Sequence, residues 1–99
     1  MYFDIQACGE RISDLRKAHS MSQFQLGIKL NISDGHVCKL EKGLRGPSID
    51  LLIDISELFQ VSLDYLILGK EKYSKASQVL NEAEAASDHI QQILHLLNP

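Results

Sequence analysis

The sequence predicts an all-α fold: five short helices followed by a longer amphipathic helix at the C-terminal end. Apolar residues recur every three or four positions along nearly the whole chain, which is the period of a helix that packs on one side. Serine or aspartate stands at the expected start of each of the five helices, and the two prolines are confined to positions 47 and 99. A chain of 99 residues is expected to build one core.

The first helix is expected from residue 5 to about residue 19, with Asp4 as its N-cap. Its buried stripe consists of Ile5, Cys8, Ile12 and Leu15. A short second helix follows, because Ser22 and Gln25 have the spacing of a capping box. It is expected to end at Asn31, since asparagine adopts the left-handed conformation more readily than other residues with a side chain.

Three further helices follow, because Ser33, Ser48 and Ser62 each have the position of an N-cap. Gly43 is expected to end the third helix, and Gly69 the fifth. The residues expected to face the core are Val37 and Leu40 on the third helix, and Ile49, Leu52, Ile53, Ile55 and Phe59 on the fourth.

The composition changes after residue 69. Residues 70–75 are polar and are predicted to form a linker, and residues 76–99 carry apolar residues in alternating steps of three and four. We expect this last helix to be a dimerisation element, and folding back onto the core of its own domain is the alternative. The residues of its expected contact face are Val79, Leu80, Ala83, Ile90, Ile93, Leu94 and Leu97.

Composition limits the classes of function. A net charge of −3 disfavours binding to nucleic acid by bulk charge, although a local basic stripe could still bind it. No apolar run approaches the about 18 residues of a membrane span. Residues 1–4 lack the features of a secretory signal, so we expect a cytoplasmic protein with no membrane partner.

Neither a metal site nor an active site is predicted. The two cysteines and four histidines contain no pair with zinc-ligand spacing, and packing explains both Cys8 and Cys38. The chain has no Gly-rich phosphate loop and no evident pair of nucleophile and base. We therefore expect no cofactor and no enzymatic activity.

The predicted helices on either side of Asn31 form a helix-turn-helix pattern, in which the small residues Gly27 and Cys38 would permit a close crossing. Several separated motifs accompany it, namely Ser22-Gln23, Leu40-Glu41-Lys42-Gly43, Pro47-Ser48 and Val61-Ser62-Leu63-Asp64-Tyr65-Leu66. With these motifs, the run from Gly9 to Gly69 resembles the phage repressor/Cro-like helix-turn-helix family. The resemblance implies a repressor-like DNA-binding domain over residues 1–69.

The resemblance also implies roles for individual residues. The position of Gln23 contacts a phosphate in this family, and Lys42 and Arg45 would meet phosphates beside the groove. Outer positions of the third helix would face base edges. The implied DNA-binding set is Gln23, Ser33, Asp34, Gly35, His36, Lys39, Lys42 and Arg45. Arg16 and Glu41 match a pair that forms a partly buried, structural salt bridge between the first and third helices.

Two of these positions depart from the family pattern, because Asp34 and Gly35 stand where members often carry Arg, Gln, Ser or Thr. Asp34 either accepts a hydrogen bond from cytosine or favours the helix dipole. Gly35 has no side chain, so His36 and Lys39 become the expected readers of base edges.

We therefore expect a sequence-specific transcriptional regulator, acting as a repressor, that binds a pseudo-palindromic operator in double-stranded DNA as a homodimer. The alternative is a protein-interaction module on the same scaffold, such as an antitoxin or an antagonist of another regulator. The acidic balance, Asp34 and Gly35 favour that alternative. Phe24, at a position that is usually polar, is either a second contact surface or a site of local packing.

Overall fold

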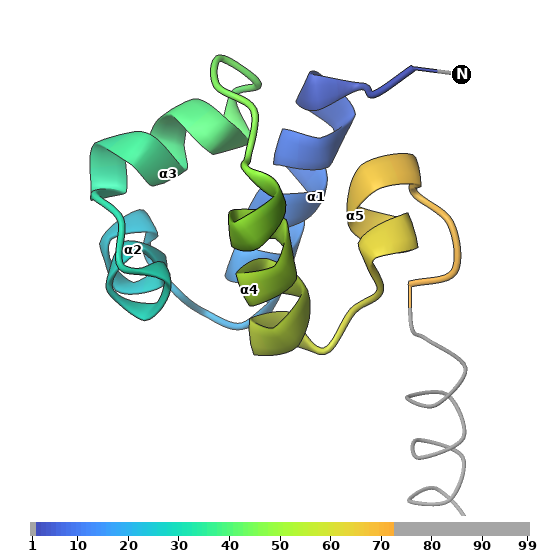
Figure 1. The fold of residues 1–99 in the computed structure, drawn as a ribbon. Coiled ribbons are helices and arrows are strands. Elements are labelled where there is room, and N and C mark those ends of the chain that lie inside the picture. The colour runs from blue at the N-terminus through green and yellow to red at the C-terminus, as the bar shows by residue number, and fades with distance from the viewer. Residues whose placement is uncertain (1, 73–99) are drawn as a thin grey trace, which may run out of the picture.

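The computed structural model of the chain describes residues 2–72. Within this range it contains no strand and five helices: α1 (Ile5–Ala18), α2 (Gln23–Leu30), α3 (Asp34–Glu41), α4 (Ile49–Phe59) and α5 (Leu63–Leu68). In Figure 1, α4 lies in front of α1, with α2 and α3 on one side and α5 on the other. None of the helices in this range is long and apolar enough to cross a membrane. The predicted all-α class is confirmed.

Each of these helices begins at a residue whose side chain accepts a backbone hydrogen bond. The N-caps are Asp4, Ser22, Ser33, Ser48 and Ser62, and each accepts from the N–H three residues further along the chain. At α2 the Ser22 N–H also donates to the Gln25 side-chain oxygen at 2.8 Å, which completes the predicted capping box. The predicted helix starts are confirmed.

Several chain reversals use left-handed backbone. Asn31 (φ 58°), Gly43 (φ 72°) and Gly69 (φ 73°) adopt it at the predicted helix ends. Gln60 ends α4 in the same conformation, with φ 55°, and was not predicted because glutamine has no special tolerance for it. Beside it, the Ser56 hydroxyl donates to the carbonyl oxygen of Val61 at 2.5 Å and fixes the path of the chain into α5.

One apolar core lies between the helices. The five bulkiest side chains with almost no exposed surface belong to Ile12, Leu26, Leu40, Ile55 and Leu66, one from each helix. The remaining core residues are Cys8, Leu15, Leu30, Val37, Leu51, Leu52, Phe59 and Val61. Because every helix contributes to the same core, the position of α3 depends on all the others.

α4 buries a different stripe from the predicted one. Ile49 is 75% exposed and Ile53 is 39% exposed, so the prediction that they face the core was wrong. Leu51 is buried in their place. With Leu51 included, the buried stripe is centred on the side of the helix away from Ile49 and Ile53.

Part of what the sequence predicts lies outside the described residues. This applies to the C-terminal helix over residues 76–99 and to residues 73–75, the second half of the predicted linker. It also applies to the proposed dimer contacts Val79, Leu80, Ala83, Ile90, Ile93, Leu94 and Leu97.

Candidate nucleic-acid interface

α2 and α3 are joined by a turn over residues 31–33. At Gly27 of α2, an added Cβ would lie 2.6 Å from the carbonyl oxygen of Ile32. The chain that leaves α2 therefore passes directly against the backbone of α2. The close approach predicted at Gly27 is present, and it is made with the turn itself, just before α3 begins.

The outer face of α3 carries the residues for which the family resemblance implied base contacts. Asp34, Gly35 and Lys39 are exposed, and His36 is half-buried. On the opposite side, Val37 is fully buried in the core. The burial pattern therefore turns the implied reading residues toward solvent.

The first turn of α3 is closed by its own side chains. The Ser33 hydroxyl oxygen accepts from the N–H of His36 at 3.0 Å. A carboxylate oxygen of Asp34 accepts from the N–H of Gly35 at 2.9 Å. A carboxylate in the first turn also interacts favourably with the helix dipole. Asp34 therefore makes the local contacts expected of an acidic residue at a helix start, which is the second of the two interpretations given for it.

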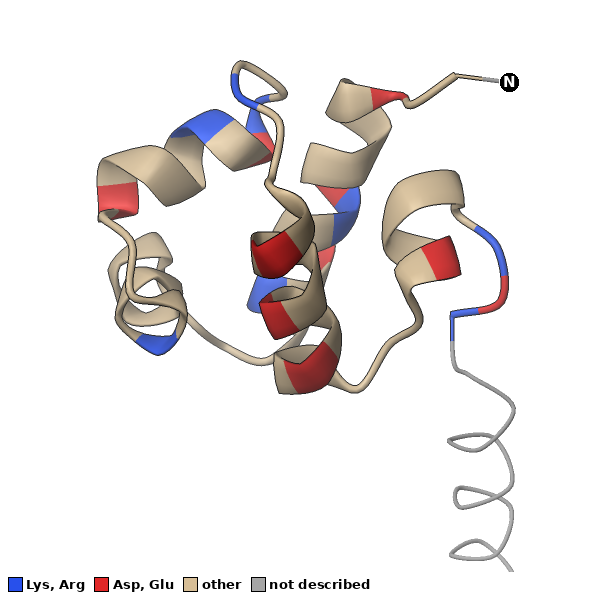
Figure 2. Cartoon of the chain, in the orientation of Figure 1, with Lys and Arg blue, Asp and Glu red and all other residues tan. Residues whose placement is uncertain are grey.

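Basic side chains follow one another along α3 and the loop after it, as Figure 2 shows. Lys39, Lys42 and Arg45 are all exposed. The exposed acidic side chains of α4 are Asp50, Asp54 and Glu57. Cations thus gather on the second half of α3 and the loop after it, and acidic residues gather on α4, while the acidic Asp34 lies at the start of α3. This gives an acidic chain a local basic surface.

His36 lies beside two of these cations. Its partial burial, followed by the positive charges of Arg45 and Lys39, holds the pKa of His36 below its ordinary value of 6.5. The imidazole is therefore mainly neutral at pH 7. A neutral imidazole offers one donor and one acceptor nitrogen, which suits hydrogen bonding to a base edge.

Replacing Arg45 with alanine is expected to raise the pKa of His36, because it removes one of the two cations that disfavour the imidazolium. An NMR titration of the histidine ring protons measures this pKa directly. As a matched control, Lys29→Ala removes a cation from α2 and is expected to leave the pKa of His36 unchanged. An unchanged pKa in Arg45→Ala would contradict the proximity of the two side chains.

A buried ion pair joins α1 to the end of α3 behind this face. Nε and Nη2 of Arg16 donate to the two carboxylate oxygens of Glu41, at 2.6 and 3.0 Å. The exposed fractions of the two side chains are 12% for Arg16 and 6% for Glu41. The pair that the resemblance implied is present, in the bidentate geometry that gives the strongest charge-assisted hydrogen bonds.

The same carboxylate receives further donors. Nε2 of Gln23 donates to Oε1 of Glu41 at 3.1 Å, while Nη1 of Arg16 donates to the carbonyl oxygen of Met21 at 2.8 Å. Burial alone would raise the pKa of Glu41, but hydrogen bonds from Arg16, Gln23 and Ser13 and the charge of Arg16 hold it below its ordinary value. The hydrogen bond to Glu41 raises the pKa of Arg16. Both partners are therefore charged at neutral pH.

Gly9 is a structural residue of this region that sequence reasoning missed. A Cβ on Gly9 would overlap the carbonyl oxygen of Leu40 and lie 2.8 Å from that of Glu41. The backbones of α1 and α3 therefore touch where α3 ends. A glycine in the middle of a predicted helix, at a cost in helix propensity, was the signal that could have revealed this contact.

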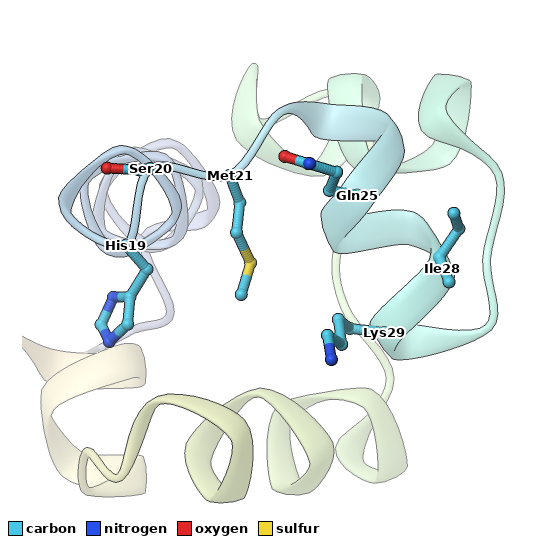
Figure 3. Close-up of a pocket in the computed structure, with 6 residues that line it drawn as sticks. All are labelled: His19, Ser20, Met21, Gln25, Ile28 and Lys29. Atoms are coloured by element: carbon cyan, nitrogen blue, oxygen red, sulfur yellow. The ribbon is translucent and has the colours of Figure 1, made fainter.

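A surface pocket of about 350 Å³ lies beside α2, and none of its lining residues belongs to α3 (Figure 3). The lining residues are His19, Ser20, Met21, Gln25, Ile28 and Lys29. Phe24, also on α2, is 63% exposed, and Ile28 is 64% exposed. Local packing therefore does not explain Phe24, and its role as a second contact surface stays a prediction.

Comparison with known proteins decides the family. Residues 12–66, more than half of the chain, match the helix-turn-helix family HTH_3. The chain belongs to the Cro/C1-like helix-turn-helix family. The family is one of DNA-binding helix-turn-helix transcriptional regulators and not one of enzymes.

Two relatives and one solved structure of the same fold illustrate the similarity. The HTH-type transcriptional regulator ImmR of Bacillus subtilis (strain 168) is 36% identical over 70 residues, which cover 71% of this chain and 54% of ImmR. The chain thus spans about half the length of that relative. The P22 c2 repressor, in a crystal structure with a synthetic operator, is 32% identical with a TM-score of 0.62, covering 66% of this chain and 98% of that solved chain. A solved SinR/SinI protein complex shares the fold, with 23% identity and a TM-score of 0.60; the match covers 91% of this chain and 93% of that one.

Proposed function

We propose that this regulator is a cytoplasmic repressor that binds a pseudo-palindromic operator as a homodimer, with α3 in the major groove. The observation that carries the proposal is the run of exposed cations Lys39, Lys42 and Arg45 beside the outer face of α3, in a chain of net charge −3. The P22 c2 repressor, 32% identical to this chain, has been solved with an operator bound, which supports the same mode of binding here.

Within this mode, the side chains divide into those that read bases and those that hold phosphates. His36 and Lys39 read base edges, and a lysine in the groove reaches the guanine O6 and N7 acceptors. Lys42 and Arg45 neutralise phosphates beside the groove, and Gln23 donates to a phosphate at the N-terminus of α2. Sequence specificity then depends on His36 and Lys39, whereas the phosphate-binding side chains contribute affinity for DNA of any sequence.

The first turn of α3 approaches the groove through its backbone. Ser33 and Asp34 accept hydrogen bonds from the N–H groups of this same turn, so both side chains already have partners there. A Cβ at Gly35 would meet no close neighbour, because the nearest atom, the Ser33 hydroxyl oxygen, lies at an ordinary contact distance of 3.9 Å. A base edge or phosphate can therefore come close to this turn.

The homodimer is proposed from the amphipathic pattern of residues 76–99, which lie outside the described residues. Two copies of α3 related by a two-fold axis would enter successive major grooves, about 34 Å apart. Sedimentation equilibrium of the purified chain tests this part: a monomer at the concentrations that bind DNA would contradict it.

The decisive experiment is selection from random duplex DNA at low salt, followed by affinity measurements on the recovered duplex as salt is raised. We expect enrichment of a pseudo-palindrome whose half-sites are one helical turn apart, and an affinity that falls steeply with salt. No enrichment by folded, dimeric protein would overturn the proposal. Repression is tested separately, by a reporter gene placed behind the recovered site.

Alanine substitutions should separate the two groups of contacts. His36→Ala and Lys39→Ala are expected to reduce discrimination between the operator and single-base variants by about 1–3 kcal/mol at the affected positions. Arg45→Ala is expected to weaken binding to every duplex and to lower the salt slope by about one unit. Fluorescence anisotropy on operator and scrambled duplexes measures both effects, and unchanged affinity and specificity in all three variants would show that the assigned face is wrong.

A second candidate function rests on the exposed apolar side chains of α2. Phe24 is 63% exposed and Ile28 64% exposed, one turn apart, which suits docking of a protein partner. In this case the chain is an antitoxin or an antagonist of another regulator. An antitoxin predicts an adjacent toxin gene whose product binds the purified chain, and Phe24→Ser should abolish that binding while leaving the fold intact. DNA selection without enrichment together with such binding would favour this function over the first.

A further inference from the structure

The carboxylate of Glu41 is a junction between three helices. It stands at the end of α3, accepts two hydrogen bonds from Arg16 of α1, and accepts a third from Gln23, the first residue of α2. Arg16 additionally donates to the carbonyl oxygen of Met21, just before α2 begins. The start of α2 is therefore tied to the buried ion pair at two points, through a side chain and through the backbone.

This junction decides which atoms Gln23 offers to solvent. A carboxylate accepts hydrogen bonds and donates none, so the Gln23 amide must turn its NH₂ group toward Glu41. The NH₂ group has a second N–H, which remains for an acceptor outside the protein. Gln23 itself is half-buried, and the Glu41 side chain that holds it is 6% exposed and fixed by Arg16. The amide is thus oriented before any DNA arrives, which reduces the ordering cost of a contact.

We infer that Glu41 is a positioning residue for DNA binding, which acts by orienting the Gln23 amide toward a phosphate. This inference rests on the phosphate contact proposed above for Gln23. A carboxylate that merely stabilised the fold would change the free energy of unfolding and leave the DNA affinity of the folded protein unchanged. A positioning carboxylate changes that affinity, and does so only while Gln23 is present.

A double-mutant cycle in DNA affinity tests the inference. Arg16→Met/Glu41→Leu replaces the ion pair by apolar side chains, a kind of exchange that often preserves stability and leaves the net charge unchanged. We expect this variant to bind the selected duplex several-fold more weakly, and Gln23→Ala to bind it about tenfold more weakly, the usual effect of one hydrogen bond to a charged group. Combined, the changes should weaken binding no more than Gln23→Ala alone.

The salt dependence provides a second readout. The Gln23 amide is neutral and releases no counterion, so these variants should keep the wild-type salt slope, whereas Arg45→Ala lowers it. As a control for general loosening of the fold, Ile55→Val alters the core at a fully buried side chain of α4 and should leave DNA affinity unchanged. If Arg16→Met/Glu41→Leu does not fold, Glu41→Asp is the substitute, because it keeps the charge beside Arg16 and draws the carboxylate back from Gln23. It should weaken DNA binding only while Gln23 is present and keep the wild-type salt slope.

The possible failures are distinguishable. If the wild-type protein binds neither the selected duplex nor a mixed-sequence duplex at low salt, the proposed function and this inference are both wrong. Binding that is unaffected by Gln23→Ala removes the phosphate contact. If the affinity losses of Gln23→Ala and of Arg16→Met/Glu41→Leu multiply in the combined variant, Glu41 does not act through Gln23, and only the positioning role is overturned. Wild-type DNA affinity in Arg16→Met/Glu41→Leu would overturn it as well.

Discussion

Replacing Gly9 with alanine is expected to lower the free energy of unfolding by about 2 kcal/mol or more. The added Cβ would overlap the carbonyl oxygen of Leu40 and lie 2.8 Å from that of Glu41. Both oxygens belong to the backbone at the end of α3, so the overlap is relieved only if α1 and α3 move apart. The better helix propensity of alanine, worth up to about 1 kcal/mol, does not offset this cost. Urea denaturation followed by far-ultraviolet circular dichroism measures the change.

Gly35 provides the matched control for this prediction. It also lies in a helix, but the nearest atom to an added Cβ is the hydroxyl oxygen of Ser33, 3.9 Å away. Gly35→Ala is therefore expected to raise the free energy of unfolding by about 0.5–1 kcal/mol, through helix propensity alone. If both substitutions stabilised the protein, the backbones of α1 and α3 would not be in contact at Gly9.

The helix boundaries were predictable because their signals are local. A serine N-cap bonds to an N–H three residues away, as Ser22 and Ser33 do, and this requires no knowledge of the rest of the chain. Left-handed helix ends at Asn31 and Gly43 likewise follow from the conformational freedom of one residue. Gln60 has no such freedom, and its left-handed conformation arises from how α4 and α5 connect.

Packing between helices was less predictable. The periodicity of α4 allows more than one buried stripe, and only the position of the neighbouring helices decides that Leu51 is buried while Ile49 is 75% exposed. The contact at Gly9 depends in the same way on the path of α3 across α1. A helix pattern identifies an apolar side, but the partner that covers it comes from elsewhere in the chain.

In the candidate site, too, local features were predictable from the sequence and contacts between helices were not. The outward position of Lys39 follows from the burial of Val37 on the other side of one helix. Arg16 and Glu41 are separated by 25 residues, so no local pattern links them, and their pairing came from the family resemblance. The hydrogen bond from Gln23 to the same carboxylate was not predicted, because it depends on how the starts and ends of three helices meet.

Removing one partner of the ion pair is expected to have the largest effect on stability. Arg16→Met leaves the carboxylate of Glu41 buried, at 6% exposure, without its cation. The expected loss at neutral pH is about 3–5 kcal/mol of the free energy of unfolding. Arg16→Met/Glu41→Leu should recover most of this loss, because no uncompensated charge then remains between α1 and α3. Chemical denaturation of the two variants beside wild type measures both values.

The pH dependence of stability tests whether the unpaired charge of Glu41 causes the destabilisation of Arg16→Met. In wild type the pKa of Glu41 is held below its ordinary value of 4.5, so its contribution to stability is complete above that pH and is lost as the pH falls through the folded-state value. In Arg16→Met the Glu41 carboxylate stays buried but has lost its interaction with Arg16, so its folded-state pKa should rise. Protonation of Glu41 then removes the unpaired charge and reduces the destabilisation of the variant. Acidification should therefore narrow the stability gap between the two proteins. A gap that stayed constant as the pH fell below 4.5 would mean that lost side-chain packing, and not the unpaired carboxylate, accounts for the destabilisation.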